Sequence, residues 1–188
     1  MSKKEFFKLI LVYAVLFIIG TAAYIASFHT FILSFLNVFF YRGIALIVLW
    51  GIIISAVMFI IKKKWMKDTI TIRDIILLFM CFCCINVVIF THLPVTADRS
   101  VTVYMLGFMD NHSDETFTKE ELEQQFIDQY VIEYGAFDKR LEEQIVSGNV
   151  EEVAPGQYQI SKGGEFLMDI YGVTVDWYAL DDKLVNPQ

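Results

Sequence analysis

The stretch that decides the fold is residues 75–100, which read IILLFMCFCCINVVIFTHLPVTADRS. Positions 75–93 contain no Asp, Glu, Lys or Arg, and this length lets a helix cross a hydrocarbon core about 30 Å thick. Charged residues return soon after Pro94. We therefore expect a membrane span over 75–93 and a water-exposed domain over 94–188.

Two earlier stretches, at about 9–28 and 43–61, have the same apolar character. The chain as a whole is 56% hydrophobic, above the share of about half that soluble domains contain. Lysines precede the first stretch as in a signal peptide, but its apolar run is too long for one, so we expect it to be retained. The predicted fold class is an α-helical membrane protein with three transmembrane helices and a small α+β C-terminal domain.

Residues 29–42 connect the first two spans and are apolar and aromatic, but they are too few to cross the membrane again. An interfacial helix or a tight re-entrant connection fits this composition. An extension of the two flanking helices to the membrane surface also fits. The sequence leaves these alternatives open.

Charge is divided unevenly along the chain. Residues 1–97 contain nine Lys and Arg against three Asp and Glu, a net charge of +6, whereas residues 98–188 contain six against nineteen, a net charge of −13. Lys and Arg near the spans favour the cytoplasmic side. Eight flank one side (Lys3, Lys4, Lys8, Lys62, Lys63, Lys64, Lys67 and Arg73) and two the other (Arg42 and Arg99). This predicts a multi-pass protein of a bacterial plasma membrane with a cytoplasmic N-terminus and an extracytoplasmic C-terminal domain, an orientation that one miscounted span would reverse.

The third span contains three cysteines and one amide. Cys81, Cys83 and Cys84 do not share one helix face and have no His beside them, so we expect them to fill a helix interface rather than to bind a metal. The C-terminal domain has no Cys and therefore no disulfide framework. Asn86 is the candidate interaction residue, because a buried amide in a span usually bonds across to another helix, in the same protein or in a partner.

The C-terminal domain is patterned as helices interrupted by one hairpin. Apolar residues spaced by three and four predict helices, and Thr118 followed by Glu121 is a capping box. The expected elements are a helix from Arg99 to about residue 110 with Asp98 as its N-cap, a second from Thr118 through Tyr130, a third over about 136–146, a β-hairpin turning at Pro155-Gly156, and a last helix from near Gly163 to Trp177 or Leu180. We expect Trp177, Tyr178 and Leu180 to pack within the domain; the membrane and a second copy are the alternative contacts.

This order of elements resembles the winged-helix family over roughly residues 99–172. The matching pieces are Thr118 to Leu122 at the entry to the second helix, Leu141, Ser147, Gly148 and Val150 after the third, and Tyr158 to Leu167 after the wing, where Gly163 replaces the family's lysine. The resemblance implies a winged-helix-like shape. It also implies DNA reading through the third helix, or service as a protein-interaction module.

DNA is not the expected partner. Nucleic-acid binding needs cations against phosphates, and Lys139 and Arg140 are opposed by neighbouring Asp138, Glu142 and Glu143. The net charge of −13 would repel a polyanion. Lys139 and Arg140 are therefore candidates for contact with a protein, and we expect no nucleic acid as a partner.

One polar cluster is compatible with chemistry at the membrane surface. Arg99 could bind a phosphate, and His92 with Asp98 could act as acid and base. The same residues are explained more simply as interfacial side chains and helix caps, so we identify no catalytic residue beyond these weak candidates. The sequence has no nucleotide-binding glycine loop, zinc-protease motif or nucleophile elbow, and we expect no cofactor and no metal.

The favoured function is that of a non-catalytic accessory or scaffold protein that binds a larger membrane enzyme or transporter of the cell envelope, with polysaccharide or lipid-linked glycan assembly as the expected process. Its partners would be the lipid bilayer and either a membrane protein or a second copy. One alternative is a small enzyme acting on a lipid-linked substrate through His92, Asp98 and Arg99. The other is a membrane-tethered winged-helix regulator whose C-terminal domain is cytosolic.

Overall fold

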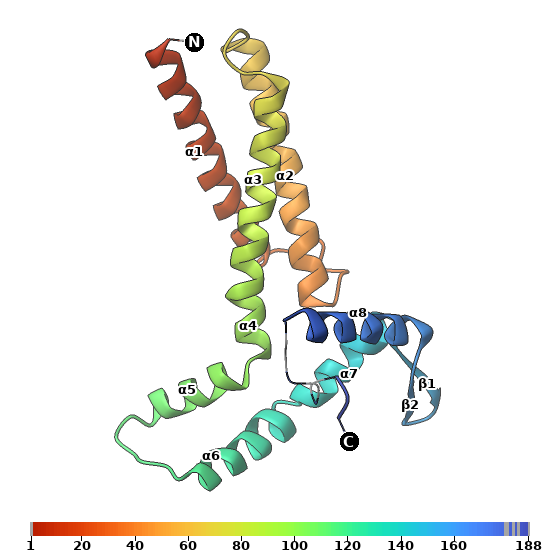
Figure 1. Ribbon diagram of the computed structural model, residues 1–188. Coiled ribbons are helices and arrows are strands. Elements are labelled where there is room, and N and C mark those ends of the chain that lie inside the picture. Colours follow the sequence, from red (N-terminus) through yellow and green to blue (C-terminus); the bar gives the residue numbers. More distant parts are fainter. Residues whose placement is uncertain (1, 179–180, 182, 184, 188) are drawn as a thin grey trace. The chain divides into compact units, whose positions relative to one another are not determined.

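The computed structural model describes residues 2–178, 181, 183 and 185–187 (Figure 1). These residues form two compact units, Met1–Val103 and Tyr104–Gln188, which we call unit 1 and unit 2 and describe separately. The structure is mostly helical, with one two-stranded sheet in unit 2.

Unit 1 is built from α1 (Lys3–Ser27), α2 (Phe39–Lys64), α3 (Ile72–His92) and the short α4 (Pro94–Arg99). The prediction of three helices long and apolar enough to cross a membrane is confirmed, and the third such segment runs on through α4. Capping boxes begin α1, at Ser2 and Glu5, and α3, at Thr71 and Asp74. Figure 1 shows α2 and α3 packed along their length with α1 beside them.

Three glycines bring the helices of unit 1 into close contact. A Cβ at Gly43 of α2 would lie 2.0 Å from Cζ of Phe90 in α3, so the phenyl ring occupies the space above this glycine. Gly20 of α1 faces Ile54, and Gly51 of α2 faces Cys83, at hypothetical Cβ distances of 2.8 and 3.0 Å. Small residues let helix backbones approach in lipid, where dispersion contacts replace the hydrophobic effect as the driving force.

Residues 28–38 connect α1 to α2 through turns, so the interfacial helix considered for residues 29–42 is not formed. Arg42, in the first turn of α2, holds this connection. Its Nη2 donates to the carbonyl oxygens of Thr30 at 2.7 Å, Ile32 at 3.1 Å and Ser27 at 3.3 Å. These carbonyl oxygens accept no α-helical hydrogen bond, so the guanidinium of Arg42 supplies donors to them. This stabilises the reversal of chain direction between α1 and α2.

Unit 2 begins within α5 (Val101–Asn111). The prediction that Asp98 caps this helix is wrong. Asp98 lies inside α4, and the backbone N–H of Val103 donates to Oγ of Ser100 at 3.2 Å. Pro94 can begin a new helical turn because its missing N–H is not needed at that position, so α4 continues to Arg99 and Ser100 becomes the cap.

The second predicted helix divides in two. The capping box of Thr118 and Glu121 is confirmed at the start of α6 (Lys119–Gln125), but a π-helix, η1 (Phe126–Glu133), replaces the expected α-helix through Tyr130. The backbone N–H of Tyr134 donates to the carbonyl of Gln129 at 2.8 Å, five residues earlier. The wider turn accompanies an aromatic cluster in which the ring of Tyr104 contacts Phe126, Tyr130 and Tyr134.

The remaining elements agree with expectation: α7 (Ala136–Val146), the antiparallel strands β1 (Val150–Ala154) and β2 (Gln157–Ile160), and α8 (Lys162–Tyr178). The hairpin turns at Gly156, whose φ is 72°. Buried Ser161 joins hairpin to helix, since its Oγ donates to the carbonyl of Gly148 at 2.6 Å and accepts from the N–H of Gly164 at 3.1 Å.

Buried side chains are distributed very unequally. Of the twelve buried hydrophobic residues among those described, only Val175 lies in unit 2. Trp177 is 80% exposed and Tyr178 is 73% exposed, which contradicts the expectation that they pack within the domain; Leu180 lies outside the described residues. Unit 1 therefore contains the core of the structure, and unit 2 has a surface rich in apolar side chains.

Candidate functional site

The three weak catalytic candidates lie around the junction of α3 and α4. His92 ends α3, and Asp98 and Arg99 end α4. The Nδ1 atom of His92 lies 2.9 Å from the carbonyl oxygen of Val88 and 3.2 Å from Oγ1 of Thr91, both in its own helix. None of the three candidates lines the membrane cavity described next. The geometry of the described residues therefore offers these groups no enclosed reaction site there.

Asn86 bonds within the protein, across the interface between α3 and α1. Its Nδ2 donates to Oγ1 of Thr21 at 3.2 Å and to the carbonyl of Phe82 at 2.9 Å. Asn86 also lines a cavity of about 300 Å³ in unit 1. Apolar and aromatic side chains form most of the wall, and the full lining is Thr21, Tyr24, Ile25, Phe28, His29, Phe39, Asn86, Ile89, Phe90 and Pro94.

An aromatic cluster supports one side of this cavity. The ring of Phe90 lies over Gly43, and its centroid is 5.4 Å from that of Phe39, 6.0 Å from that of Phe28 and 6.4 Å from that of Tyr24. Phe90 itself is 1% exposed. The cavity wall is thus fixed by ring packing, which favours a preformed ligand site over one that opens only on binding.

The cysteines of α3 are placed as structural residues. Cys83 is half-buried and faces Gly51 of α2, whereas Cys81 and Cys84 are exposed on the helix surface. Within the described part of the chain, no three His, Cys, Asp or Glu side chains come together as metal ligands. The expectation that the cysteines fill a helix interface therefore holds for Cys83 and is wrong for Cys81 and Cys84, which lie on the exposed surface of α3.

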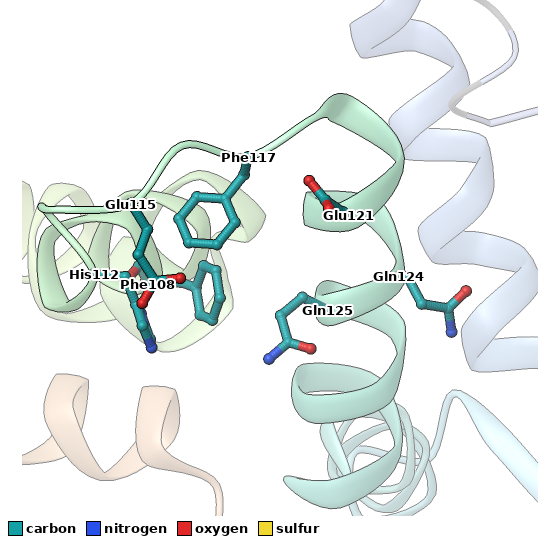
Figure 2. A pocket seen from close by; sticks show the side chains of 7 residues that line it. All are labelled: Phe108, His112, Glu115, Phe117, Glu121, Gln124 and Gln125. Carbon is teal, nitrogen blue, oxygen red and sulfur yellow. The ribbon is translucent and has the colours of Figure 1, made fainter.

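Unit 2 contains an open hollow of about 470 Å³ between α5 and α6, shown in Figure 2. The rings of Phe108 and Phe117, with centroids 5.1 Å apart, lie opposite Glu121 and Gln125. Glu121 already accepts from the backbone N–H of Thr118 at 2.7 Å and from its hydroxyl, bonds that hold the pKa of this carboxyl below its ordinary value. A carboxylate engaged in a helix cap is poorly suited to act as a base, so this hollow supports contact with another molecule better than chemistry.

The cations of α7 are balanced by acidic neighbours. Nη1 of Arg140 lies 2.6 Å from Oε2 of Glu143, a buried carboxylate one turn away. Lys139 is exposed; Asp138 directly precedes it in the chain, and Glu142 lies three residues after it in α7. The arrangement lacks the free cationic face that phosphate binding needs.

The most extensive feature of unit 2 is its exposed apolar surface. Large hydrophobic side chains are exposed on every one of its elements except α6. The exposed large hydrophobic residues on α8 are Phe166, Met168, Ile170, Tyr171, Val173, Trp177 and Tyr178. Apolar surface of this extent on a folded domain marks contact with protein or membrane.

Sequence reasoning missed three residues on which these features depend. Thr21 receives the hydrogen bond of Asn86, Gly43 makes room for Phe90, and Arg42 binds three carbonyls of the connection between α1 and α2. The signals available were a glycine and a hydroxyl within apolar spans, which are individually common in membrane helices.

No protein-family model matches the chain, and comparisons with curated proteins and with solved structures find no significant match.

Proposed function

We propose that the chain is a non-catalytic accessory or scaffold protein that binds a larger membrane enzyme or transporter through unit 2. The observation that carries this proposal is the contrast in packing between the units. Unit 1 has a continuous core, whereas Val175 is the one buried hydrophobic residue described in unit 2. A folded segment that leaves so many aromatic and aliphatic side chains exposed is completed by another molecule.

The net charge of unit 2 favours a different protein, rather than a second copy of this chain, as the molecule that covers its apolar surface. Residues 104–188 contain five Lys and Arg against eighteen Asp and Glu, a net charge of −13. Two such surfaces would repel each other, while a partner with an apolar centre and a cationic rim would be attracted. The order of α5, α6, α7, hairpin and α8 supports a winged-helix-like interaction module. We propose envelope polysaccharide or lipid-linked glycan assembly as the process, because its enzymes act at the membrane surface.

The direct test is extraction of the protein from its native membrane in a mild detergent, followed by measurement of the mass of the complex. We expect a complex heavier than the monomer that contains a second, larger membrane protein. Trp177→Ala should weaken this association at least tenfold, because exposed aromatic anchors dominate interface energetics. Trp65→Ala is the matched control, since it removes an equally exposed tryptophan from unit 1. Recovery of wild type as a lone monomer, or equal retention by both variants, would contradict the proposal.

We further propose that unit 2 is extracytoplasmic in a bacterial plasma membrane. The support is the excess of Lys and Arg on the side of the N-terminus and of the connection between α2 and α3. The orientation can be measured with two variants, each with one new cysteine on one side of the membrane. Ser113→Cys lies in the exposed connection between α5 and α6, and Asp68→Cys lies in the exposed connection between α2 and α3.

An impermeant thiol reagent should label Ser113→Cys in intact cells and Asp68→Cys only after lysis. Wild type measures the background from the three native cysteines of α3. The reverse labelling pattern would place unit 2 in the cytosol and favour the tethered regulator.

A further inference from the structure

Two polar side chains that line the membrane cavity have hydrogen-bonding capacity that the protein leaves unused. Asn86 is 1% exposed and Tyr24 is 5% exposed. Both donor positions of the Asn86 amide are used, at Thr21 and Phe82, but among the described residues nothing donates to its Oδ1. The hydroxyl of Tyr24 likewise has no hydrogen-bond partner in the described part of the chain.

These oxygens are not sealed inside the helix packing. Among the described residues, every side-chain nitrogen or oxygen that is fully buried has a hydrogen-bond partner. An oxygen without a partner, such as Oδ1 of Asn86 or the hydroxyl of Tyr24, is therefore not fully buried. Both oxygens therefore reach accessible space, and the cavity is the space that both residues line. In a hydrocarbon core, a polar group left without a hydrogen-bond partner is strongly disfavoured, so an occupant that bonds to both oxygens would be preferred.

We propose that this cavity binds a neutral, largely apolar molecule that carries a hydroxyl group, such as a lipid or isoprenoid alcohol. A hydroxyl group donates to Oδ1 of Asn86 and accepts from the hydroxyl of Tyr24, which matches the two unused positions. The apolar body of such a molecule matches the wall formed by Phe28, Phe39 and Ile89.

The lining favours a neutral head group over an anionic one. It contains no Lys or Arg, and its one basic side chain is that of His29. The guanidinium of Arg42 lies 5.8 Å from the ring centroid of Phe28, but Arg42 does not line the cavity, and its Nε and Nη2 donate to carbonyls of the connection between α1 and α2. A phosphate placed here would lose its hydration without gaining a lysine or arginine cation, so a neutral hydroxyl group is preferred. The cavity of about 300 Å³ lies at the lower end of the size range of small-molecule pockets, which suits a short isoprenoid alcohol.

The test uses the full chain in proteoliposomes and a photoreactive diazirine analogue of geraniol. We expect saturable crosslinks that map to peptides containing residues 21–29 and 86–94. Unlabelled geraniol should compete, whereas geranyl methyl ether, which has no hydroxyl to donate, should compete about tenfold less well. Geranyl phosphate should also compete poorly. Equal competition by the ether, better competition by the phosphate, or crosslinking that does not saturate would overturn the proposal.

Two pairs of variants separate binding from folding. Tyr24→Phe keeps the ring and should weaken competition by geraniol about tenfold, while Tyr13→Phe removes a hydroxyl elsewhere on α1 and should not. Ile89→Phe narrows the cavity and should abolish the saturable crosslink, whereas Ile85→Phe, one turn earlier on α3 and outside the cavity lining, should preserve it. Equal behaviour within both pairs would contradict the site whatever the protein partner of unit 2 proves to be.

Discussion

Replacing Gly43 with alanine is expected to lower the stability of the three-helix bundle by about 3 kcal/mol or more. The added methyl would lie 2.0 Å from Cζ of Phe90 and 2.4 Å from its Cε1, far inside van der Waals contact. The ring cannot move away freely, because it is 1% exposed and packs against Phe28 and Phe39. Unfolding by a denaturing detergent, followed from micelles of a mild one, measures the change.

Gly107→Ala is the matched control for this experiment. Gly107 is also helical, in α5, but a Cβ there would meet nothing within 4 Å. We expect this variant to be neutral or stabilised by up to about 1 kcal/mol, because alanine favours the helix. Adding Phe90→Leu to Gly43→Ala should recover part of the loss, since the two changes act on one contact. Equal stability of the two alanine variants would show that Phe90 does not depend on the space at Gly43.

Arg42→Ala is expected to destabilise the connection between α1 and α2 by about 3 kcal/mol. The change removes the arginine donors to the carbonyls of Thr30 and Ile32 and to that of Ser27, which still accepts from the N–H and hydroxyl of Thr30. Hydrogen bonds from a charged donor contribute about 1.5–3 kcal/mol each, and exposure of part of the loop reduces their sum. Limited proteolysis of proteoliposomes should show faster cleavage within residues 28–38 than in wild type.

Arg42→Lys tests geometry separately from charge. An ammonium group keeps the positive charge but lacks the planar fork that reaches several carbonyls, so protection from cleavage should return only in part. Arg73→Ala, which removes an exposed arginine at the start of α3, should leave cleavage of residues 28–38 unchanged. A lysine variant as resistant as wild type would mean that charge alone holds the connection.

The sequence predicted features that depend on local chemistry. Apolar runs of sufficient length define α1, α2 and α3, because a bilayer permits few alternatives to a helix. The capping box at Thr118 and the turn at Gly156 also depend on adjacent residues alone, so α6 and the hairpin begin where expected.

Features that depend on contacts distant in the sequence could not be predicted in this way. The π-helix η1 contains no residue that marks it, and it accompanies packing around Tyr104, more than twenty residues earlier in the chain. The fit of Phe90 over Gly43 joins positions in two different helices. Of the residues that line the cavity, Asn86 could be singled out because it is an amide inside a span. Thr21 and Tyr24 are ordinary residues of a membrane helix, and their role depends on the packing of α1 against α3.

The unequal distribution of buried side chains means that this chain has no single free energy of unfolding. Eleven of the twelve buried hydrophobic residues in the described part of the chain belong to unit 1, so loss of structure in unit 2 removes few buried contacts. A two-state treatment applies only where one cooperative transition covers the whole chain. The three tryptophans divide conveniently between the units, with Trp50 and Trp65 in unit 1 and Trp177 in unit 2. Fluorescence from variants that keep one tryptophan thus reports two separate transitions, and only that of unit 2 should shift to a higher temperature when the proposed partner is added.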